Sequence, residues 1–496
     1  MARNIKWDFQ TEVVVVGFGA AGAVAAMTVR DAGPQVIIVE KQTKEGHLTT
    51  SHMSAGIFIS VNNASAAAAY MEQINKVNDH LHWTDPATSR VWAEYASHNR
   101  EWIEHLGSRV KLIAQGGEHR HVTGYDSIEL YGFPGMGRGL MRCLKRQVAA
   151  REIAVQYGTR AVALLTDPEG TVLGVRVQHQ DKTLNMRATK AVIMAPGGFE
   201  FNEEMKLNYL KVYPTYFAGS PANTGDGHSM VQAAGASLWH MNCCSASWVI
   251  KAPDFPIGFG PDFKGVKGFN QWFSKVAQGT DCAYIITDKY GRRYTNEEFK
   301  RHTVYYEMAH FDSQNLDYPR VPSYWIFDSR RMAAGPLPLM FYGPMLFRLY
   351  PWSRDNREEM KKGWIVEGAT PEELATKLKM PVSALEKTFS DYNRYCQQKE
   401  DPEFQRPPRH LIALDRPPFY AIALWPGSAN TQGGPRRNHR AQIVNAAGEP
   451  IPRLYGAGEF GSIYGMLYPA GGGNLAECIA FGRLAGENAA RENAHF

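Results

Sequence analysis

The first apolar run of the chain predicts a buried strand, a helix and a second strand in succession. Val13–Val16 are four β-branched residues in a row, and Gly17 ends the run. An apolar run without alternation is typical of a parallel strand, because both faces of such a strand are covered. The pattern then predicts a helix over Ala20–Asp31, ended by Gly33-Pro34, and a second strand over Val36–Val39. The chain therefore opens as a βαβ unit.

Three glycines indicate the chemistry of this βαβ unit. Gly17, Gly19 and Gly22 form a G-x-G-x-x-G pattern where the first strand meets the helix. The first glycine makes a tight turn, the second lets the backbone approach a pyrophosphate, and the third lets the helix pack closely on the strand. Glu40 follows Gly22 by 18 residues, near the spacing expected for an acid that accepts from a ribose hydroxyl. Because all these parts are in register, we predict a dinucleotide site rather than a chance glycine turn.

The next stretch alternates loops and helices. Gly46–Gly56 is a loop of small and hydroxylated residues, which can donate hydrogen bonds to a heterocycle or to phosphates. Apolar positions at helical spacing predict a helix over about Pro86–Leu106. A second glycine loop, Gly135–Gly139, opens a helix over Leu140–Ala149. Two interpretations of this second loop stay open: it approaches a bound ligand, or it is simply a turn.

Alternating apolar and polar residues then predict a β-meander packed on the first domain. The alternating segments are Ala154–Gln156, Arg160–Leu165, Val172–Gln178 and Leu184–Ala188. A separate apolar strand, Ala191–Ala195, runs into Gly197-Gly198. Two glycines there indicate that another group approaches the backbone closely. Further on, Asp226 introduces a helix, either as its N-cap, as an acceptor on the cofactor side, or as both.

The texture of the sequence changes between residues 241 and 429, where aromatic residues and prolines are dense and the βα rhythm disappears. We predict that residues 241–429 form an inserted α+β capping domain, and that residues 1–240 and 430–496 form one discontinuous nucleotide-binding domain of the α/β class. Two amphipathic helices are expected in the insertion, over Pro371–Met380 and Val382–Glu400, with Thr370 as the N-cap of the first.

Composition mainly excludes classes of protein. The net charge of +5 comes from 54 basic and 49 acidic residues that are spread thinly, so nothing indicates nucleic-acid or membrane binding. No apolar run reaches the ~18 residues of a membrane span, and the polar start leads us to expect no signal peptide. The six cysteines show no C-x-x-C spacing, which argues against an iron–sulfur cluster, zinc or covalent haem. We expect no metal, and a cytoplasmic protein with reduced thiols.

A second set of glycines lies near the end of the chain. Leu454–Glu459 is a strand that ends in small residues and an acid, and Pro469–Leu475 is a glycine loop that opens a helix. The N-terminus of that helix would stabilise the negative charge that builds on a flavin during reduction. A chain that returns here to complete its nucleotide site fits FAD better than NAD, because FAD extends across the sheet.

Taken together, the motifs resemble the fumarate reductase and succinate dehydrogenase flavoprotein superfamily, which also contains the ketosteroid dehydrogenases. The motifs are the opening fingerprint, Ala195-Pro-Gly-Gly198, Thr224-Gly-Asp-Gly227, Arg293-Tyr-Thr-Asn-Glu297, Leu454-Tyr-Gly-Ala-Gly-Glu459 and Gly472-Gly-Asn474. The resemblance implies a Rossmann-type FAD-binding domain interrupted by a capping domain. It also implies hydride exchange between flavin N5 and a carbon of a carbonyl-activated C=C bond. The cofactor-binding residues it implies are Gly17, Gly19, Ala21, Gly22, Glu40, Lys41, Ser51, Ala55, Gly56, Ala161, Asp226, Glu459, Asn474 and Leu475.

The resemblance also bears on how FAD is held. The succinate dehydrogenase branch links its flavin covalently through a histidine in the loop after the fingerprint. The matching position here is Thr50, and His52 is two residues out of register. We therefore expect non-covalent FAD.

Three departures from the fumarate reductases concern the substrate. Ala470 stands where an Arg clamps a substrate carboxylate, and Asn430 stands where a substrate-binding His precedes a Gly-Gly pair. Ala277 and Thr280 stand near the positions of an acid and an Arg that relay protons. A dicarboxylate would meet fewer cationic groups than it needs, so we do not expect fumarate as the substrate.

The candidate catalytic residues resemble two different branches. Arg301 stands where the fumarate reductases carry a proton-donating Arg, with a structural ion pair as the alternative. Tyr468 and Gly472 resemble the ketosteroid dehydrogenase pair in which a Tyr hydroxyl and a backbone N–H hold a ketone oxygen, which is an oxyanion hole; the alternative is a core aromatic. An Arg suits proton donation better than proton abstraction, and Tyr305 or Tyr306 would supply a phenolic base instead. Alternatively, Arg301 anchors the carboxylate of a cyclic keto-acid.

The leading hypothesis is an FAD-dependent oxidoreductase that introduces or reduces a C=C bond adjacent to a ketone, in a steroid-like or cyclohexanone-like ring. The alternative is an enoate reductase of the fumarate or urocanate reductase type with Arg301 as proton donor. A third hypothesis, a flavin subunit that only relays electrons, is disfavoured by the aromatic-rich insertion. Because no haem or iron–sulfur motif is present, electrons must come from or go to an external donor or acceptor. The sequence indicates neither the direction of the reaction nor the oligomeric state.

Overall fold

The computed structural model describes residues 5–278, 281–298 and 302–495. The chain divides into two compact units. Unit 1 comprises Met1–Leu210, Gly219–Cys244 and Asn430–Phe496, and unit 2 comprises Lys211–Ala218 and Ser245–Ala429. The sequence predicted Lys211–Ala218 in the nucleotide-binding domain, whereas these residues belong to unit 2, in which Tyr216 and Phe217 pair with Gly427 and Ser428.

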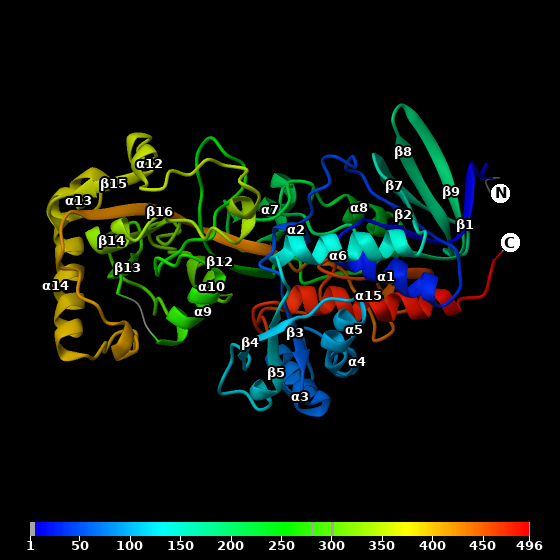
Figure 1. The fold of residues 1–496 in the computed structure, drawn as a ribbon, viewed down its shortest axis with the longest axis horizontal. Coiled ribbons are helices and arrows are strands. Elements are labelled where there is room, and N and C mark those ends of the chain that lie inside the picture. The colour runs from blue at the N-terminus through cyan, green and yellow to red at the C-terminus, as the bar shows by residue number, and fades with distance from the viewer. Residues whose placement is uncertain (1–4, 279–280, 299–301, 496) are drawn as a thin grey trace. The chain divides into compact units, whose positions relative to one another are not determined.

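The core of unit 1 is an eight-stranded sheet with the order β18-β19-β9-β1-β2-β6, to which β7 and β8 are joined through β9. The strands are β1 (Phe9–Val16), β2 (Val36–Val39), β6 (Ala154–Gln156), β7 (Thr159–Thr166), β8 (Val172–His179), β9 (Lys182–Met194), β18 (Gln442–Val444) and β19 (Pro450–Gly456). Strands β2 and β9 flank β1 in parallel, and β19 is parallel to β9. The carboxyl ends of these strands therefore meet at one edge, and this edge carries the fingerprint (Figure 1).

The sheet differs from the predicted β-meander in two respects. Ala154–Gln156 is not part of the meander, because β6 pairs in parallel with β2. The two segments predicted as Leu184–Ala188 and Ala191–Ala195 are one continuous strand, β9. The first half of β9 pairs with β8 and its second half pairs with β1 and β19, so one strand joins the antiparallel and the parallel parts of the sheet.

Helix α1 (Ala20–Asp31) has the predicted bounds and packs along α15 (Gly473–Arg491), as Figure 1 shows. Small residues make this close packing possible. A Cβ at Gly482 would press on Val24, and one at Gly486 would press on Thr28. Because contacts advance along both helices in the same direction, α1 and α15 are parallel and their N-termini point the same way.

The other helices of unit 1 surround the sheet and a smaller antiparallel sheet. They are α2 (Thr50–Met53), α3 (Ala64–Asn75), α4 (Pro86–Ser97), α5 (Asn99–His105), α6 (Met136–Ala150), α7 (Glu203–Tyr209) and α8 (Asp226–Ala233). The smaller sheet has the order β3-β5-β4, and β11 pairs with β17. These strands are β3 (Ile57–Val61), β4 (Lys111–Gln115), β5 (Ile128–Gly132), β11 (Leu238–Trp239) and β17 (Gly434–Pro435).

The single helix predicted over Pro86–Leu106 is two helices, α4 and α5, that break at His98. The Tyr95 carbonyl, which a continuous helix would pair with the Asn99 N–H, accepts instead from the His98 N–H at 3.1 Å and from Arg483 of α15 at 2.6 Å. The Asn99 side chain is also buried, and its Nδ2 donates to the Ile59 carbonyl at 3.0 Å. Tertiary hydrogen bonds therefore replace the helical ones at this point.

Unit 2 is built on a six-stranded sheet centred on the long strand β16 (Phe419–Thr431), which pairs with β10, β12, β14 and β15 (Figure 1). The other strands are β10 (Tyr216–Phe217), β12 (Cys244–Ile250), β13 (Tyr284–Thr287), β14 (Ser323–Asp328) and β15 (Ile365–Gly368). The helices are α9 (Phe269–Gln278), α10 (Val304–Met308), α11 (Ser329–Ala333), α12 (Arg357–Lys361), α13 (Pro371–Leu378) and α14 (Val382–Gln398). Thr370 is the N-cap of α13, as predicted, and its Oγ1 accepts from the Glu373 N–H at 3.1 Å.

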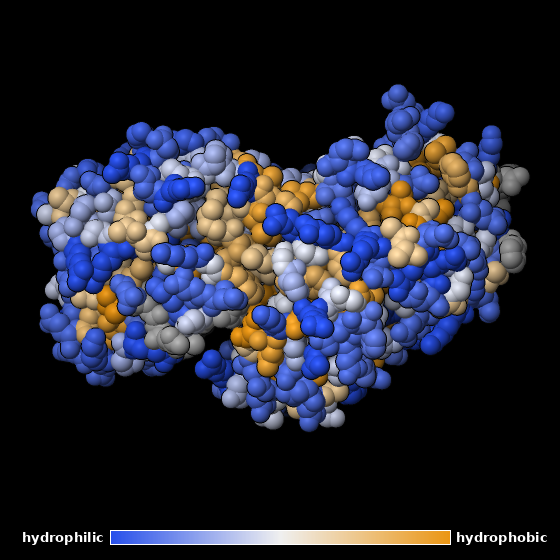
Figure 2. All heavy atoms as spheres, viewed as in Figure 1, coloured by the Kyte–Doolittle hydropathy of each residue, from blue (hydrophilic) through white to orange (hydrophobic). Residues whose placement is uncertain are grey.

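Hydrophilic residues cover most of the face drawn in Figure 2, with apolar groups between them. Over the part of the chain that the structure describes, no helix is both long and apolar enough to cross a bilayer. Within the same residues, no group of three or more His, Cys, Asp or Glu side chains is placed to hold a metal ion.

Candidate functional site

The fingerprint glycines adopt the backbone that a phosphate-binding turn requires. Gly17 has a φ of +98°, a conformation that favours glycine, and a Cβ there would overlap the Ala195 carbonyl at the end of β9. A Cβ at Gly22 would overlap the Gly17 carbonyl, so this glycine lets α1 start close to the strand. Gly19 differs, because a Cβ there would meet only Ser51 Oγ at 3.6 Å. The first and third glycines thus serve the fold, and Gly19 leaves the backbone open to a ligand.

The N-terminus of α1 lies beside the loop that follows Glu40. Gly19 is the N-cap of α1 and offers no side chain, and the Ala20 N–H is accepted by Ser51 Oγ at 3.1 Å. Gly56 has a φ of +66°, and a Cβ there would overlap Met136 at the start of α6. Ala55 precedes it in the same loop. The segment predicted as one loop therefore contains the short helix α2 with Ser51, followed by Ala55 and Gly56, and it packs against two helix N-termini.

The second glycine loop belongs to this packing. Gly135 is the N-cap of α6, with a φ of +78°. A Cβ at Gly137 would overlap the Ser51 carbonyl, and one at Gly139 would overlap the Pro134 carbonyl. Of the two interpretations of Gly135–Gly139, the structure favours a turn that lets α6 approach α2, which contains Ser51.

Glu40 follows β2 directly and is buried. Its Oε2 accepts from the Phe18 N–H at 2.9 Å, and its Oε1 accepts from the Gln42 N–H at 2.9 Å. Burial alone would raise the pKa of this carboxyl, but the His47 imidazole and these two N–H groups outweigh burial and lower it. Glu40 is therefore an anion at neutral pH, as an acceptor for a ribose hydroxyl must be, and it also fastens the glycine turn.

Lys41 and Asp226 form an ion pair, with Lys41 Nζ 2.9 Å from Asp226 Oδ2. Arg160 Nη2 lies 2.9 Å from Asp226 Oδ1 on the other side. Burial raises the pKa of Asp226, but hydrogen bonds from Arg160 and Lys41 outweigh it and lower the pKa. The structure makes Gly225, not Asp226, the N-cap of α8, and the Asp226 side chain binds Lys41 and Arg160 instead of capping the helix. Ala161, beside Arg160 on β7, is buried.

The His52 side chain takes part in capping the short helix α2. Its Nδ1 lies 2.9 Å from Thr49 Oγ1, within the capping box of α2. Burial, followed by the charges of Lys145 and His47, lowers the pKa of His52 to about 3. The Thr50 hydroxyl, at the position of the covalent histidine in the succinate dehydrogenase branch, accepts from the Ser220 N–H at 3.1 Å.

The two halves of the predicted cofactor site meet inside unit 1. A Cβ at Gly458 would lie 2.9 Å from Ala21 Cβ and 3.4 Å from Cys478 Sγ, so the loop after β19 touches both α1 and α15. Glu459 Oε1 accepts from the Gly198 N–H at 3.1 Å and from Asn223 Nδ2 at 2.6 Å. The segment that carries Gly458 and Glu459 therefore contacts the fingerprint helix and the tip of β9.

Tyr468 and Gly472 lie at the N-terminus of α15. Gly472 is the N-cap, with a φ of +94°, and Tyr468 Oη accepts from the Asn474 N–H at 2.7 Å. The side-chain amide of Asn474 pairs with that of Gln432, with N–O distances of 3.2 and 3.3 Å in the two directions. Leu475, the next residue of α15, is buried. The structure thus brings the two predicted carbonyl-binding groups to one helix end.

The remaining catalytic candidates fall within the sequence range of unit 2. Tyr305 is buried in α10, and its hydroxyl accepts from the Lys211 N–H at 2.9 Å. Arg301 and Thr280 lie outside the described residues. Arg293, part of the motif ahead of Arg301, binds Glu297 and Asp401, with N–O distances of 2.9 Å.

The two neutral substitutions in the expected carboxylate clamp are both buried in unit 1. Ala470 is in the core near the start of α15. Asn430 is buried as well, and its Nδ2 donates to the carbonyl of Thr431 at 2.8 Å. Neither position offers a positive charge to a substrate carboxylate.

Sequence reasoning missed three polar residues of this region. Glu200 Oε1 accepts from the Thr431 N–H and Oγ1 at 2.7 and 2.8 Å, and Asn223 links Glu459 to Thr50. Gln432 pairs with Asn474. Their one signal in the sequence is proximity to the motifs Gly197-Gly198, Thr224-Gly225 and Gly433-Gly434.

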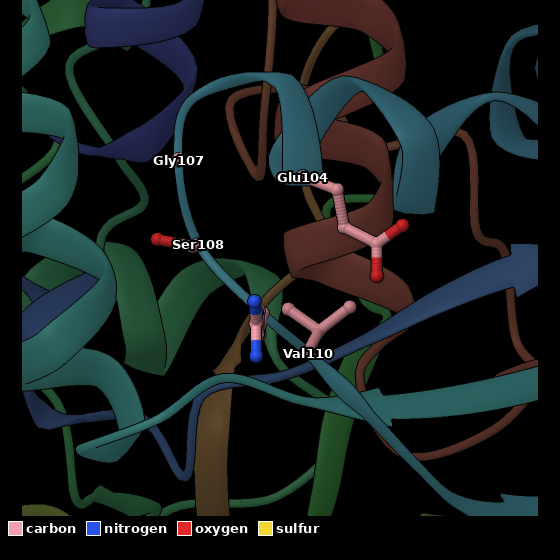
Figure 3. Close-up of a pocket in the computed structure, with 5 residues that line it drawn as sticks. Glu104, Gly107, Ser108 and Val110 are labelled. Carbon is pink, nitrogen blue, oxygen red and sulfur yellow. The ribbon is translucent and has the colours of Figure 1, made fainter.

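A separate surface cavity of about 530 Å³ lies between α5 and β4, and Figure 3 shows its lining. The lining residues are Glu104, Gly107, Ser108, Arg109 and Val110. None of them is a predicted site residue, and Glu104 is paired with Arg100. This cavity is therefore distinct from the glycine-rich edge of the sheet.

The residues at this edge fit FAD on three observations. Gly19 leaves open backbone at a helix N-terminus, Glu40 is an anionic acceptor at the end of β2, and Gly458 brings a second glycine segment against α1. Such a set can hold a pyrophosphate, a ribose and a flavin along one sheet edge.

Comparisons with known proteins agree with this interpretation. A family model described as FAD binding domain matches residues 12–475. A probable fumarate reductase of Shewanella frigidimarina is 27% identical over 97% of this chain and 75% of its own length. A 3-oxosteroid 1-dehydrogenase of Mycobacterium tuberculosis is 28% identical over 71% of this chain and 62% of its own length. The solved structure of a 3-ketosteroid delta1-dehydrogenase from Sterolibacterium denitrificans, in complex with 1,4-androstadiene-3,17-dione, superposes with a TM-score of 0.81. That comparison covers 97% of this chain and 99% of the other at 20% identity, so it supports the fold alone.

Proposed function

This chain belongs to the FAD binding domain family and is an FAD-dependent oxidoreductase, and we propose that it introduces or reduces a C=C bond adjacent to a ketone. The substrate we propose is cyclic, with a steroid-like or cyclohexanone-like ring. When bound, FAD supplies hydride exchange at its N5 atom. The residues we propose to hold it, without a covalent bond, are those at the sheet edge: Gly17, Gly19, Ala21, Gly22, Glu40, Lys41, Ser51, Ala55, Gly56, Ala161, Asp226, Glu459, Asn474 and Leu475.

The observation that carries this proposal is the pairing of Tyr468 with the N-terminus of α15. The Asn474 N–H, 2.7 Å from Tyr468 Oη, withdraws electron density from that oxygen and strengthens the hydroxyl as a donor. The positive end of the α15 dipole acts in the same direction. Together with the Gly472 N–H, the Tyr468 hydroxyl would hold a ketone oxygen and stabilise the negative charge that it gains.

The neutral character of Ala470 and Asn430 supports a ketone over a dicarboxylate. Binding a dicarboxylate needs charge-assisted hydrogen bonds at both ends, usually from Arg. A ketone oxygen needs two neutral donors, which Tyr468 and Gly472 provide.

For the proton we propose Arg301 or Tyr305. An Arg stays protonated at any ordinary pH, so Arg301 suits donation during reduction of the C=C bond. Tyr305 would act in the opposite direction as a base, and its hydroxyl is already ordered by the Lys211 N–H.

The second candidate is an enoate reductase with Arg301 as proton donor. The 27% identity with the fumarate reductase over 97% of this chain favours it. It predicts that enzyme reduced by a low-potential dye reoxidises with an unsaturated acid. Absence of reoxidation across a panel of such acids would count against it.

We further propose that electrons pass to or from an external small-molecule or protein partner, and that the enzyme works in the cytoplasm. All six cysteines are unbridged and buried, as expected for thiols in a reducing compartment. The thinly spread charge supports a small-molecule substrate rather than nucleic acid.

Anaerobic mixing tests the proposal directly. Oxidised enzyme is combined with a panel of cyclic ketones and saturated acids, and bleaching of the flavin absorbance is followed. We expect bleaching with a cyclic ketone, or reoxidation of reduced enzyme by the corresponding enone.

Tyr468→Phe should then lower turnover by ~10²–10³ while FAD content stays intact, because one donor to the oxyanion is lost. Tyr464→Phe is the matched control. Its hydroxyl lies in the same loop but donates to the Gly473 carbonyl at 2.9 Å. A loss below about fivefold in Tyr468→Phe would remove Tyr468 from the mechanism.

A further inference from the structure

Two carboxyl groups lie close together around Gly198, at the tip of β9. The Gly198 N–H donates to Glu459 Oε1 at 3.1 Å. On its other side, a Cβ at Gly198 would lie 2.5 Å from Glu200 Oε1 and 2.9 Å from Glu200 Oε2. Glu200 is 1% exposed, and Glu459 is half-buried.

One oxygen of each carboxyl accepts hydrogen bonds that stabilise its ionised form. Glu200 Oε1 accepts from the N–H and the hydroxyl of Thr431, and Glu459 Oε1 accepts from Gly198 and Asn223. Glu200 Oε2, however, is buried without a hydrogen-bond partner among the described residues. Burying an ionised carboxylate oxygen without a partner costs free energy, whereas a protonated oxygen can donate a hydrogen bond through its O–H.

Lys41, Arg160 and Arg437, on neighbouring elements, form ion pairs with other carboxylates. Lys41 and Arg160 pair with Asp226, the first residue of α8, and Arg437 pairs with Glu477 of α15. His228 of α8 packs on the Phe199 ring, and burial lowers its pKa to about 4, so it is neutral at pH 7. The Glu477 charge adds to the repulsion felt by Glu459.

We propose that Glu200 and Glu459 hold a single proton between them at neutral pH, so that the pair carries one negative charge instead of two. Glu200 is then a positioning residue, which sets the charge that Glu459 presents at the cofactor site. Two like charges in one buried site cannot both ionise at ordinary cost. In agreement, desolvation followed by the charge of Glu200 raises the pKa of Glu459, and desolvation raises the pKa of Glu200.

The consequence for the enzyme concerns the charge of the reduced flavin. Reduction places negative charge on FAD, so each fixed negative charge nearby opposes it. A pair that keeps one proton opposes reduction less than two carboxylates would. This inference goes beyond the proposed function, because it holds whichever substrate the enzyme uses.

Infrared spectroscopy of the purified protein, with isotope-labelled glutamate to assign bands, tests the shared proton. We expect a protonated-carboxyl stretch in the native protein at pH 7, and its loss in Glu200→Gln and in Glu459→Gln, because the remaining carboxyl ionises. Glu487→Gln is the control, since that carboxylate accepts from Tyr95 Oη at 2.8 Å elsewhere in unit 1 and should leave the band unchanged. A native protein without the band, or a band that survives in both single variants, would overturn the proposal.

The reduction potential of bound FAD gives a second readout. Glu200→Gln keeps the net charge of the pair at one and should leave the potential near that of the native protein. The double variant with Gln at both positions removes the charge and should raise the potential. Equal steps from native to single to double variant would mean that two carboxylates were ionised at the start. Where one single variant fails to fold, loss or survival of the band in the other single variant still decides.

Discussion

Removal of Arg437 should strongly weaken unit 1. Arg437 is fully buried and pairs with Glu477, which is also fully buried. The same guanidinium donates to the carbonyls of Gly456 at 3.0 Å, Gly458 at 3.2 Å and Gly461 at 2.9 Å. One side chain thus ties the loop after β19 to α15.

The cost of Arg437→Met can be worked from these contacts. Methionine fills most of the space but leaves the Glu477 carboxylate buried without its cation, which costs ~3–5 kcal/mol. With an unfolding entropy of ~2.1 cal/mol/K per residue, the roughly 300 residues of unit 1 give about 0.6 kcal/mol/K. A loss of about 4 kcal/mol therefore lowers Tm by about 6 °C.

Thermal unfolding of the purified protein, followed by circular dichroism and by release of FAD fluorescence, measures this change. Arg436→Met is the matched control, because Arg436 is exposed and its substitution should change stability by less than about 0.5 kcal/mol. Adding Glu477→Leu to Arg437→Met should restore part of the loss, since the unpaired charge is then gone. A Tm drop below about 2 °C, or a double variant no more stable than Arg437→Met, would refute the assignment of the cost to the stranded carboxylate.

Two further predictions separate the roles of individual groups. Gly19→Ala should fold normally, because its Cβ meets only Ser51 Oγ at 3.6 Å, but it should bind FAD weakly, because the added methyl group occupies the open backbone. Gly22→Ala should instead lower Tm, because its Cβ overlaps the Gly17 carbonyl. The opposite pattern in Tm and FAD content would contradict these roles. In unit 2, burial would raise the pKa of Glu298, but Lys264, Arg406 and His410 outweigh it and lower the pKa to about 2. Its stabilisation, about 3 kcal/mol, is therefore complete above pH ~4.5 and is lost as the pH falls towards 2. Glu298→Gln should flatten this acid dependence in denaturation curves, while the exposed Glu372→Gln should not; an unchanged slope in Glu298→Gln would contradict the assignment.

The parts of the fold that depend on local pattern were accessible from the sequence. Ala20–Asp31 and Val36–Val39 have the predicted bounds, because glycine and proline stop them and apolar neighbours bury them. Thr370 caps its helix as predicted, because an N-cap depends only on the next three residues.

Features that depend on distant partners were not accessible. At the break near His98, the Tyr95 carbonyl accepts from Arg483, which is far along the chain, and the parallel pairing of Ala154–Gln156 with β2 has no local signal. Asn223 and Glu200 acquire their roles only through Glu459 and Thr431, more than 200 residues away. Such residues are found by folding the chain, because nothing in their own neighbourhood distinguishes them from surface polar residues.

The contacts of α15 explain why holding FAD and performing chemistry can be studied separately. Along its length, α15 packs on α1 through Gly482 and Gly486, anchors the loop after β19 through Glu477, and presents Asn474 to Tyr468 at its start. All the residues proposed to hold FAD belong to unit 1, whereas Tyr305 belongs to unit 2. Changes deep in α15 should therefore alter FAD content and stability together. Removing the Tyr468 hydroxyl, which adjoins the first turn of α15, should alter turnover with FAD in place, because that donor acts on the substrate oxygen, whereas Asn474 and Leu475 of the same turn are proposed to hold FAD.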